Sequence, residues 1–216
     1  MKNHILNSIP GNFILGWYMD DTSLCDRIID WFNNTTEKDP GVIHNEFGQR
    51  VINKTIKDSV DSQIPDNKLL VEYYDHLRSV MQSYYNIYPL ASYGDEVDVL
   101  QRPNIQYYPP GGGFKIWHSE RLSGVEPGGS RHLAFMTYLN DVTDRGGTQF
   151  YHQRINLRPE KGLTMIWPTD WTHFHRGVPS PTQEKYIVTG WFNFVQNKSG
   201  NKRTFPAIKD PGIPTQ

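Results

Sequence analysis

Residues 99–120, VLQRPNIQYYPPGGGFKIWHSE, place two runs of β-branched and aromatic residues on either side of a proline- and glycine-rich turn. Runs of this kind, separated by Pro and Gly, are typical of short strands joined by tight turns. The pattern continues in HLAFMTYLN (132–140), TQFYH (148–152), LTMIWP (163–168), WTHFHRGV (171–178) and KYIVTGWFNF (185–194). Short strands at this spacing predict a sandwich or jelly roll over residues 98–195.

The chain before residue 98 shows helical spacing instead. Leu24, Ile28 and Phe32 recur on one helical face and predict a helix over 22–34. A second apolar face predicts a helix over 67–86, which Pro89 ends. We interpret both helices as covering one face of a sheet. The sequence therefore predicts one domain over 1–216, with a helical N-terminal part (1–97), a β core (98–195) and a polar tail (196–216).

The composition limits which binding partners and which cellular compartment are expected for this protein. Lys plus Arg is 22 and Asp plus Glu is 23, so the formal charge is -1 and gives no reason to expect nucleic acid or an anionic membrane as partner. Cys25 is the only cysteine, which excludes an intramolecular disulfide. The first residues lack the apolar core of a signal peptide, and no apolar run is long enough to span a membrane. We therefore expect a cytoplasmic protein.

His118-Ser119-Glu120 is the first candidate metal motif. Residues two apart on a strand point to the same side, so the imidazole and the carboxylate could reach one cation. The tripeptide is weak by itself, and the same pattern recurs at His44-Asn45-Glu46. The context of the tripeptide is stronger evidence for a metal site. It follows a glycine-rich turn, and the pair His173 and His175 lies in a later predicted strand.

Two histidines and one carboxylate form the facial triad of non-haem iron(II) oxygenases, which leaves three coordination positions open. His173 and His175 alternate onto the same strand face, so periodicity does not choose between them as the second histidine ligand. The other histidine would then be a hydrogen-bonding neighbour of the ligands.

The segment from Ile105 to Phe194 resembles the catalytic core of the prolyl-hydroxylase branch of the 2-oxoglutarate/Fe(II) oxygenases, which includes the prolyl 4-hydroxylases. The blocks that carry the resemblance, in the family's order, are QYYPPGGGFKIWHSE, RHLAFMTYLND, GGTQF, PEKGLTMIWP and HRGVPSPTQEKYIVTGWF. The resemblance implies a mainly β fold with helices, in which N-terminal helices support a double-stranded β-helix core (a cupin-like jelly roll).

The resemblance also implies roles for nine residues. The expected iron ligands are His118, Glu120 and His175. The expected 2-oxoglutarate contacts are Lys185, Tyr108 and Tyr138. Neighbours of the ligands, or residues on the substrate side, are expected to be His173, Arg131 and Trp191. One departure is visible, because most of the branch has aspartate where this chain has Glu120, and the extra methylene moves the carboxylate by about 1.5 Å.

The function implied is hydroxylation of an unactivated C–H bond, with Fe(II) as cofactor, 2-oxoglutarate and O2 as co-substrates and ascorbate as a candidate reductant. The first candidate substrate is a prolyl residue in a peptide or protein, and the second is a free amino acid or another small molecule. Two alternatives of other classes are a non-catalytic jelly-roll binding module and a zinc hydrolase. Lys185 argues against both alternatives. The apolar run YIVTGWF that follows it predicts a buried strand, and a buried ammonium needs a carboxylate partner.

Overall fold

A nine-stranded antiparallel sheet forms the centre of the molecule. The computed structural model describes residues 2–4, 11–44 and 47–195. Strands follow one another across the sheet in the order β1 (Asn3–His4), β2 (Leu15–Tyr18), β14 (Leu163–Pro168), β11 (Arg131–Tyr138), β16 (Lys185–Phe194), β9 (Asn104–Tyr108), β7 (Val60–Gln63) and β3 (Asp39–Pro40). The ninth strand, β8 (Val97–Asp98), pairs with the end of β16.

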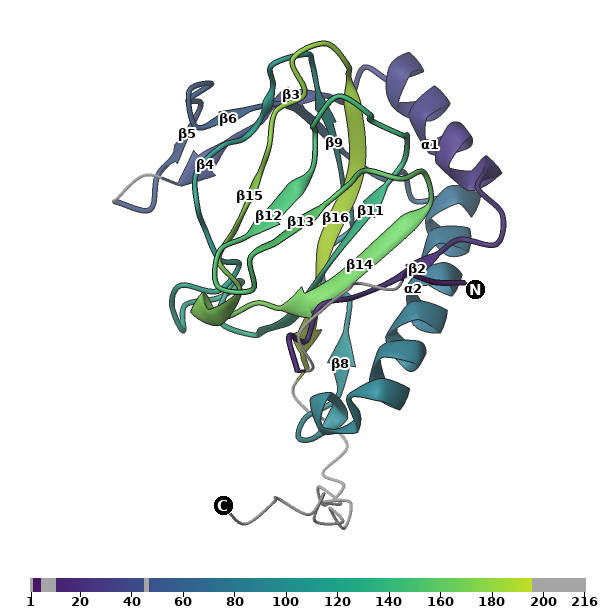
Figure 1. The fold of residues 1–216 in the computed structure, drawn as a ribbon, viewed down its shortest axis with the longest axis vertical. Coiled ribbons are helices and arrows are strands. Elements are labelled where there is room, and N and C mark those ends of the chain that lie inside the picture. Colours follow the sequence, from purple (N-terminus) through teal and green to yellow (C-terminus); the bar gives the residue numbers. More distant parts are fainter. Residues whose placement is uncertain (1, 5–10, 45–46, 196–216) are drawn as a thin grey trace.

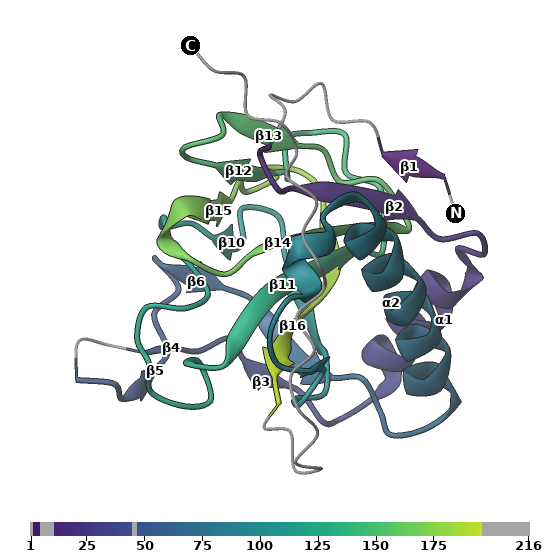
Figure 2. The ribbon, with the colours of Figure 1, turned by 90° about the horizontal axis from the view of Figure 1, so that it is seen from below.

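Smaller sheets lie on one face of the large sheet. One of them has the order β13 (Ile155–Leu157), β12 (Thr148–Phe150) and β15 (His175–Gly177). Two-stranded pairs are formed by β10 (Gly113–Phe114) with β6 (Lys57–Asp58), and by β4 (Ile43–His44) with β5 (Arg50–Val51). In Figure 2, β11 and β16 lie between the helices and the three-stranded sheet of β12, β13 and β15. This two-layer antiparallel arrangement is the double-stranded β-helix, so the predicted fold class is confirmed.

Two helices cover the other face, along one side of the molecule in Figure 1. They are α1 (Ser23–Asn34) and α2 (Lys68–Ile87), within about one residue of the predicted ranges, and a short 3-10 helix (Pro89–Ser92) follows α2. The side chain of Asn67 caps α2 by accepting a hydrogen bond from the backbone N–H of Leu69 at 2.8 Å. Among the described residues, no helix has both the length and the apolar composition of a membrane span.

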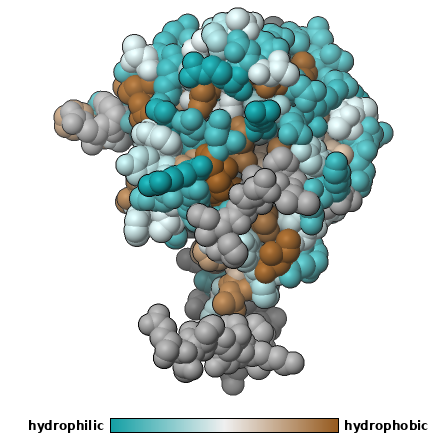
Figure 3. All heavy atoms as spheres, viewed as in Figure 1, coloured by the Kyte–Doolittle hydropathy of each residue, from teal (hydrophilic) through white to brown (hydrophobic). Residues whose placement is uncertain are grey.

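Alternating side chains of the sheet build two hydrophobic cores. On β11, Leu133 and Phe135 pack against the helices in what we call the helix-side core, while Met136 and Tyr138 enter the inner core between the two sheets. Other inner-core residues are Tyr108, Phe150, Trp167 and Ile187. The face drawn in Figure 3 is mostly hydrophilic, with small separate apolar patches. The inner core is therefore the apolar wall available to a site between the sheets.

Four segments differ from the predictions. Residues 1–97, for which only helices were predicted, also contain β1 to β7, and four of these strands (β1, β2, β3 and β7) extend the large sheet. These strands are two to four residues long, too short to show a period of two. The strand predicted over 113–120 is only Gly113–Phe114, and β13 was not predicted. Residues 171–178 begin with a 3-10 turn (Trp171–His173), so strand alternation does not apply to His173.

Candidate active site

Two histidines and one carboxylate converge beside the inner core. His118, Glu120 and His175 each offer a ligand atom, and these atoms lie within 4.8 Å of one another. Nε2 of His175 is 3.2 Å from Oε1 of Glu120, and Nε2 of His118 is 3.8 Å from the same oxygen. Neighbouring ligands of one metal ion lie about 3 Å apart, so small side-chain adjustments bring all three onto an ion. The added methylene of Glu120 does not keep it from the cluster.

An isolated β-bridge brings the two histidines together. The backbone N–H of His118 donates to the carbonyl of His175 at 3.0 Å, and the N–H of His175 donates back at 2.8 Å. Directly paired residues place their side chains side by side, and the two rings have centroids 4.4 Å apart. Backbone pairing between distant segments thus forms this part of the site.

Hydrogen bonds to the backbone direct both imidazoles toward the cluster. Nδ1 of His118 lies 3.0 Å from the carbonyl of Ile116, and Nδ1 of His175 lies 3.0 Å from the carbonyl of His173. A carbonyl only accepts, so each Nδ1 carries the proton and each Nε2 keeps its lone pair for a metal. Burial, with a smaller effect from His175, lowers the pKa of His118 to about 4, so its ring is neutral near pH 7. Neutral rings bind metal without first losing a proton.

Glu120 is held as a carboxylate by its neighbours. Burial by itself raises its pKa, but the neighbouring side chains of His175, His118 and Arg131 outweigh burial and lower the pKa to about 2. Oε2 accepts a hydrogen bond from Nε1 of Trp191 at 2.8 Å. Arg131 donates to the backbone carbonyl of Glu120 at 2.8 Å and stacks on the Trp191 ring at 3.4 Å. The Glu120 carboxylate is thus ionised, and its oxygen Oε1 is oriented toward the histidines.

A β-bulge explains why Arg131 reaches this site. The register between β11 and β16 shifts between Arg131 and Leu133, and from Leu133 onward the odd-numbered residues face the helices. Without the shift Arg131 would point to the helix-side core as well. A bulge changes the direction of side chains locally, and here it places the guanidinium against Trp191.

Trp191→Phe is expected to lower Fe(II) affinity by about 10- to 100-fold, because phenylalanine keeps the ring beside Arg131 but removes the hydrogen bond that orients the Glu120 carboxylate. Anaerobic titration calorimetry with Fe(II) measures this change. Trp171→Phe is the matched control, because Trp171 is 65% exposed and lies outside the cluster. Equal affinity in Trp191→Phe and the parent protein would show that this hydrogen bond does not support the site.

A buried lysine lies farther inside, at the start of β16. Lys185 is 4% exposed, and its Nζ donates to the carbonyl of Gly146 at 2.6 Å. Burial lowers its pKa to about 8. In the described part of the chain, Lys185 has no carboxylate partner. A buried ammonium without a counter-ion is a position for an anionic ligand.

Two tyrosines lie next to this lysine on neighbouring strands. Tyr108 pairs directly with Lys185 across β9 and β16, and Nζ lies 5.0 Å from its ring centroid. Tyr138 pairs with Ile187 and is the diagonal neighbour of Lys185. The hydroxyl of Tyr108 donates to Gln106 at 2.6 Å, and that of Tyr138 shares a hydrogen bond with Thr148 at 2.7 Å. Both phenols are buried and neutral, because burial raises their pKa.

The lysine pocket and the metal cluster share the inner core. Rings of Phe150 and Trp167 flank His175 at centroid distances of 5.5 and 5.1 Å, and both residues belong to the core that contains Tyr108 and Tyr138. The charge of Glu120 contributes to the raised pKa of Tyr108, which places the two within electrostatic reach. The inner core therefore offers a metal cluster and a buried ammonium to the two ends of one ligand.

His173 lies outside the cluster. Its Nε2 is 2.9 Å from the carbonyl of Asn12, and its Nδ1 is 2.9 Å from the hydroxyl of Thr172. Its contribution is the backbone carbonyl that accepts from His175. Of the two histidines that periodicity left open, the geometry brings His175 to Glu120. The other motif of this kind, His44-Asn45-Glu46, has its last two residues outside the described part of the chain.

A buried ion pair, which was not predicted from the sequence, lies on the same side of the large sheet as Tyr108. Nζ of Lys57 lies 2.6 Å from Oδ2 of Asp61, and the side chains are 6% and 15% exposed. Lys57 also lies 5.9 Å from the ring of Phe114, which stacks on His118 at 3.9 Å. The segment KDSVDSQ (57–63) has the composition of an ordinary polar surface, and the pairing of β6 with β10 and of β7 with β9 brings it to the site.

A double-stranded β-helix with a His-Glu-His cluster defines a class of proteins, the non-haem metal oxygenases. Residues 103–193, a little under half of this protein, match the family model described as 2OG-Fe(II) oxygenase superfamily. The protein is therefore a 2-oxoglutarate- and Fe(II)-dependent oxygenase, with Fe(II) as its metal and 2-oxoglutarate as its co-substrate. A search of curated proteins finds no match to this chain.

Solved structures with the same fold include three prolyl hydroxylases. Viral collagen prolyl hydroxylase from Paramecium Bursaria Chlorella virus-1, in its 2OG complex, is 15% identical with a TM-score of 0.62, over 86% of this chain and 98% of that chain. The Pseudomonas putida prolyl-4-hydroxylase is 16% identical with a TM-score of 0.65, over 84% of this chain and 92% of that chain. The Trichoplax adhaerens prolyl hydroxylase, in complex with a hypoxia inducible factor peptide fragment, is 15% identical with a TM-score of 0.66, over 85% of this chain and 84% of that chain. At these identities the likeness shows the fold.

Proposed function

We propose that this oxygenase hydroxylates an unactivated C–H bond of a prolyl residue in a peptide or protein. The observation that carries the reaction class is the His-Glu-His cluster beside a buried lysine that has no carboxylate partner. The prolyl substrate is supported by the resemblance of residues 105–194 to prolyl hydroxylases and by the similar structures that bear that name. A single domain over residues 1–216 is part of the proposal.

Each residue has a distinct part in this proposal. His118, Glu120 and His175 hold the iron, with both imidazoles oriented through Nδ1. Lys185 and Tyr138 bind the distal carboxylate of 2-oxoglutarate, which supplies the missing counter-ion. When bound, the iron and 2-oxoglutarate supply the oxidising chemistry with O2, and the protein contributes position and electrostatics.

Three further residues support these groups. Tyr108 contacts the metal-binding end of 2-oxoglutarate, and its hydroxyl proton is then donated to that ligand in place of Gln106. Trp191 and Arg131 keep the Glu120 carboxylate in place. The inner-core rings around His175 exclude water from the space between iron and lysine.

Addition of a proline-containing peptide is expected to raise 2-oxoglutarate turnover at least about tenfold over the rate without substrate, because substrate binding commits the oxidant to a productive reaction. Succinate release measures turnover, and mass spectrometry detects one added oxygen on proline. A peptide in which alanine replaces proline is the control.

Other outcomes of this assay distinguish the alternatives. Stimulation by a free amino acid and by none of the peptides would replace the peptide substrate with a small molecule. Equal turnover with the proline and alanine peptides would contradict prolyl hydroxylation. A binding module or a zinc hydrolase would consume no 2-oxoglutarate under any of these conditions.

A further inference from the structure

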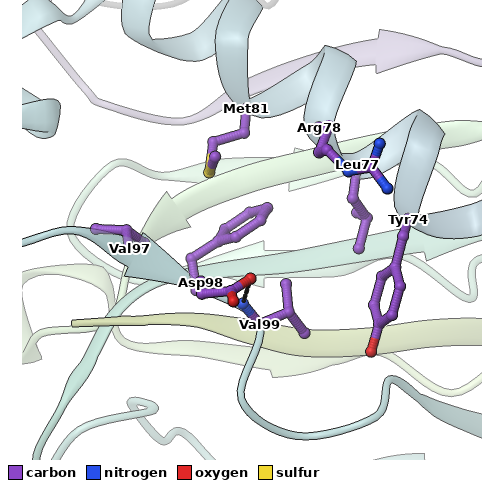
Figure 4. Close-up of a pocket in the computed structure, with 8 residues that line it drawn as sticks. Tyr74, Leu77, Arg78, Met81, Val97, Asp98 and Val99 are labelled. Atoms are coloured by element: carbon purple, nitrogen blue, oxygen red, sulfur yellow. Dashed lines mark hydrogen bonds between the residues drawn. The ribbon is translucent and has the colours of Figure 1, made fainter. Parts of the chain in front are cut away.

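A groove separates α2 from β8 on the face of the large sheet opposite the metal cluster. It encloses about 240 Å³. Figure 4 shows Tyr74, Leu77 and Met81 projecting from the helix toward the strand segment of Val97 and Val99. Phe192 also lines the groove. The groove continues past Met81 and Val97 to Glu96.

Acidic side chains lie along this groove. Glu96 and Asp98 are both exposed, and neither has an ion-pair partner in the described part of the chain. The one basic residue of the lining, Arg78, is 2.7 Å from Asp75 and is therefore already neutralised. The groove thus presents an apolar floor with negative charge beside it, which fits a segment that carries apolar and basic residues together.

The chain itself leads to this groove. The end of β16 pairs with β8, and the backbone N–H of Val195 donates to the carbonyl of Glu96 at 2.8 Å. Residues 196–216 follow and lie outside the described part. They contain four basic residues and one acidic residue, and Lys202-Arg203 is followed closely by Phe205 and Ile208. The seven residues from Val195 to Lys202 span at most about 25 Å, which suffices to reach a groove that begins at Glu96.

We propose that the segment 198–208 of this chain is the occupant of the groove. Phe205 and Ile208 bury their side chains against the apolar floor, and Lys202 and Arg203 face Glu96 and Asp98. A covalently attached segment has an effective concentration in the millimolar range, so an interaction that would be weak between separate molecules is sufficient. The docked segment covers α2, the helix that supports the sheet beneath the active site.

Thiol labelling of the full chain tests this proposal. Met81→Cys places a reporter in the groove, and Val71→Cys places one on the same helix at a side chain that is 57% exposed and absent from the groove lining. Cys25 does not interfere, because it is buried and burial raises the pKa of its thiol to about 12. Each reporter is combined with Phe205→Ser/Ile208→Ser or Lys202→Glu/Arg203→Glu, which leave all described residues of the fold unchanged.

If segment 198–208 occupies the groove, either pair of tail substitutions releases it. The labelling rate at position 81 is then expected to rise at least about tenfold, and the rate at position 71 is expected to stay unchanged. Hydrogen exchange over 74–85, in chains that keep Met81, is expected to increase in parallel. Equal rates with and without the tail substitutions would overturn the proposal. Protection that depends on protein concentration and not on the tail sequence would also overturn it, in favour of a second copy of the chain in the groove.

Discussion

His175→Ala is expected to lower Fe(II)-dependent turnover of 2-oxoglutarate by more than about a hundredfold. Loss of a residue that merely orients a ligand costs 10- to 100-fold, so removal of a ligand itself costs more. Nε2 of His175 is also the imidazole nitrogen closest to Glu120, at 3.2 Å, and without it the carboxylate keeps only His118 as a partner for the ion. Succinate release and anaerobic iron content together measure the effect.

The histidine two residues earlier gives the sharpest control for this result. His173 binds Asn12 and Thr172 through its side chain and orients His175 through its backbone carbonyl, which any residue supplies. His173→Gln is therefore expected to keep iron binding, with a loss of stability as its main effect. If His173→Gln lost iron and His175→Ala kept it, the distal ligand would be His173 and the cluster would need a different arrangement.

Lys185→Met is expected to weaken 2-oxoglutarate binding by about a hundredfold while stabilising the ligand-free protein. The binding loss corresponds to about 3 kcal/mol, a typical cost of removing one partner from a buried charge pair. Stability changes in the opposite direction, because burial lowers the pKa of Lys185 to about 8 from 10.5. At pH 7 this difference destabilises the folded ligand-free state by about 3 kcal/mol.

Methionine removes that cost but also the hydrogen bond to Gly146, worth about 1 kcal/mol, so a net gain of about 2 kcal/mol is expected at pH 7. Between about pH 8 and 10.5 the unfolded chain binds the lysine proton more tightly than the folded one. Stability of the parent protein therefore includes a contribution from Lys185 that rises with pH across this window, and Lys185→Met loses it.

Calorimetric binding of 2-oxoglutarate and urea unfolding at pH 7 and 9.5 measure both effects. Lys68→Met is the control, because the side chain of Lys68 is 85% exposed and its removal should change stability by less than about 0.5 kcal/mol. Unchanged 2-oxoglutarate affinity in Lys185→Met would contradict the assigned role. A strong loss of stability would show that Lys185 has a structural counter-ion.

The long elements of this fold are readable from the sequence, and the short ones are not. The helices Ser23–Asn34 and Lys68–Ile87, and strands such as β11 and β16, extend over enough residues to show a period. Strands of two to four residues, among them β2 and β7, owe their structure to pairing with β14 and β9. Tertiary pairing of this kind leaves no local pattern in the sequence.

The geometry of the candidate site depends even more on distant pairing. The sequence indicates which residue types can bind iron, but the convergence of His118 and His175 comes from a bridge between segments 57 residues apart in sequence. The choice between His173 and His175 depends on a 3-10 turn that interrupts the expected strand. Hydrogen bonds such as Trp191 to Glu120 follow from the same register, which a single sequence does not reveal.

The most direct test of the iron and 2-oxoglutarate site is the visible spectrum of the parent protein under anaerobic conditions, with Fe(II) and 2-oxoglutarate added together. A keto-acid chelated to iron gives a weak charge-transfer band in the visible region, as the family resemblance implies. We expect this band in the parent protein at a 2-oxoglutarate concentration that does not produce it in Lys185→Met, and we expect no band in His175→Ala. Absence of the band in the parent protein, with metal and keto-acid in excess, would contradict the assignment of this cluster as the iron site.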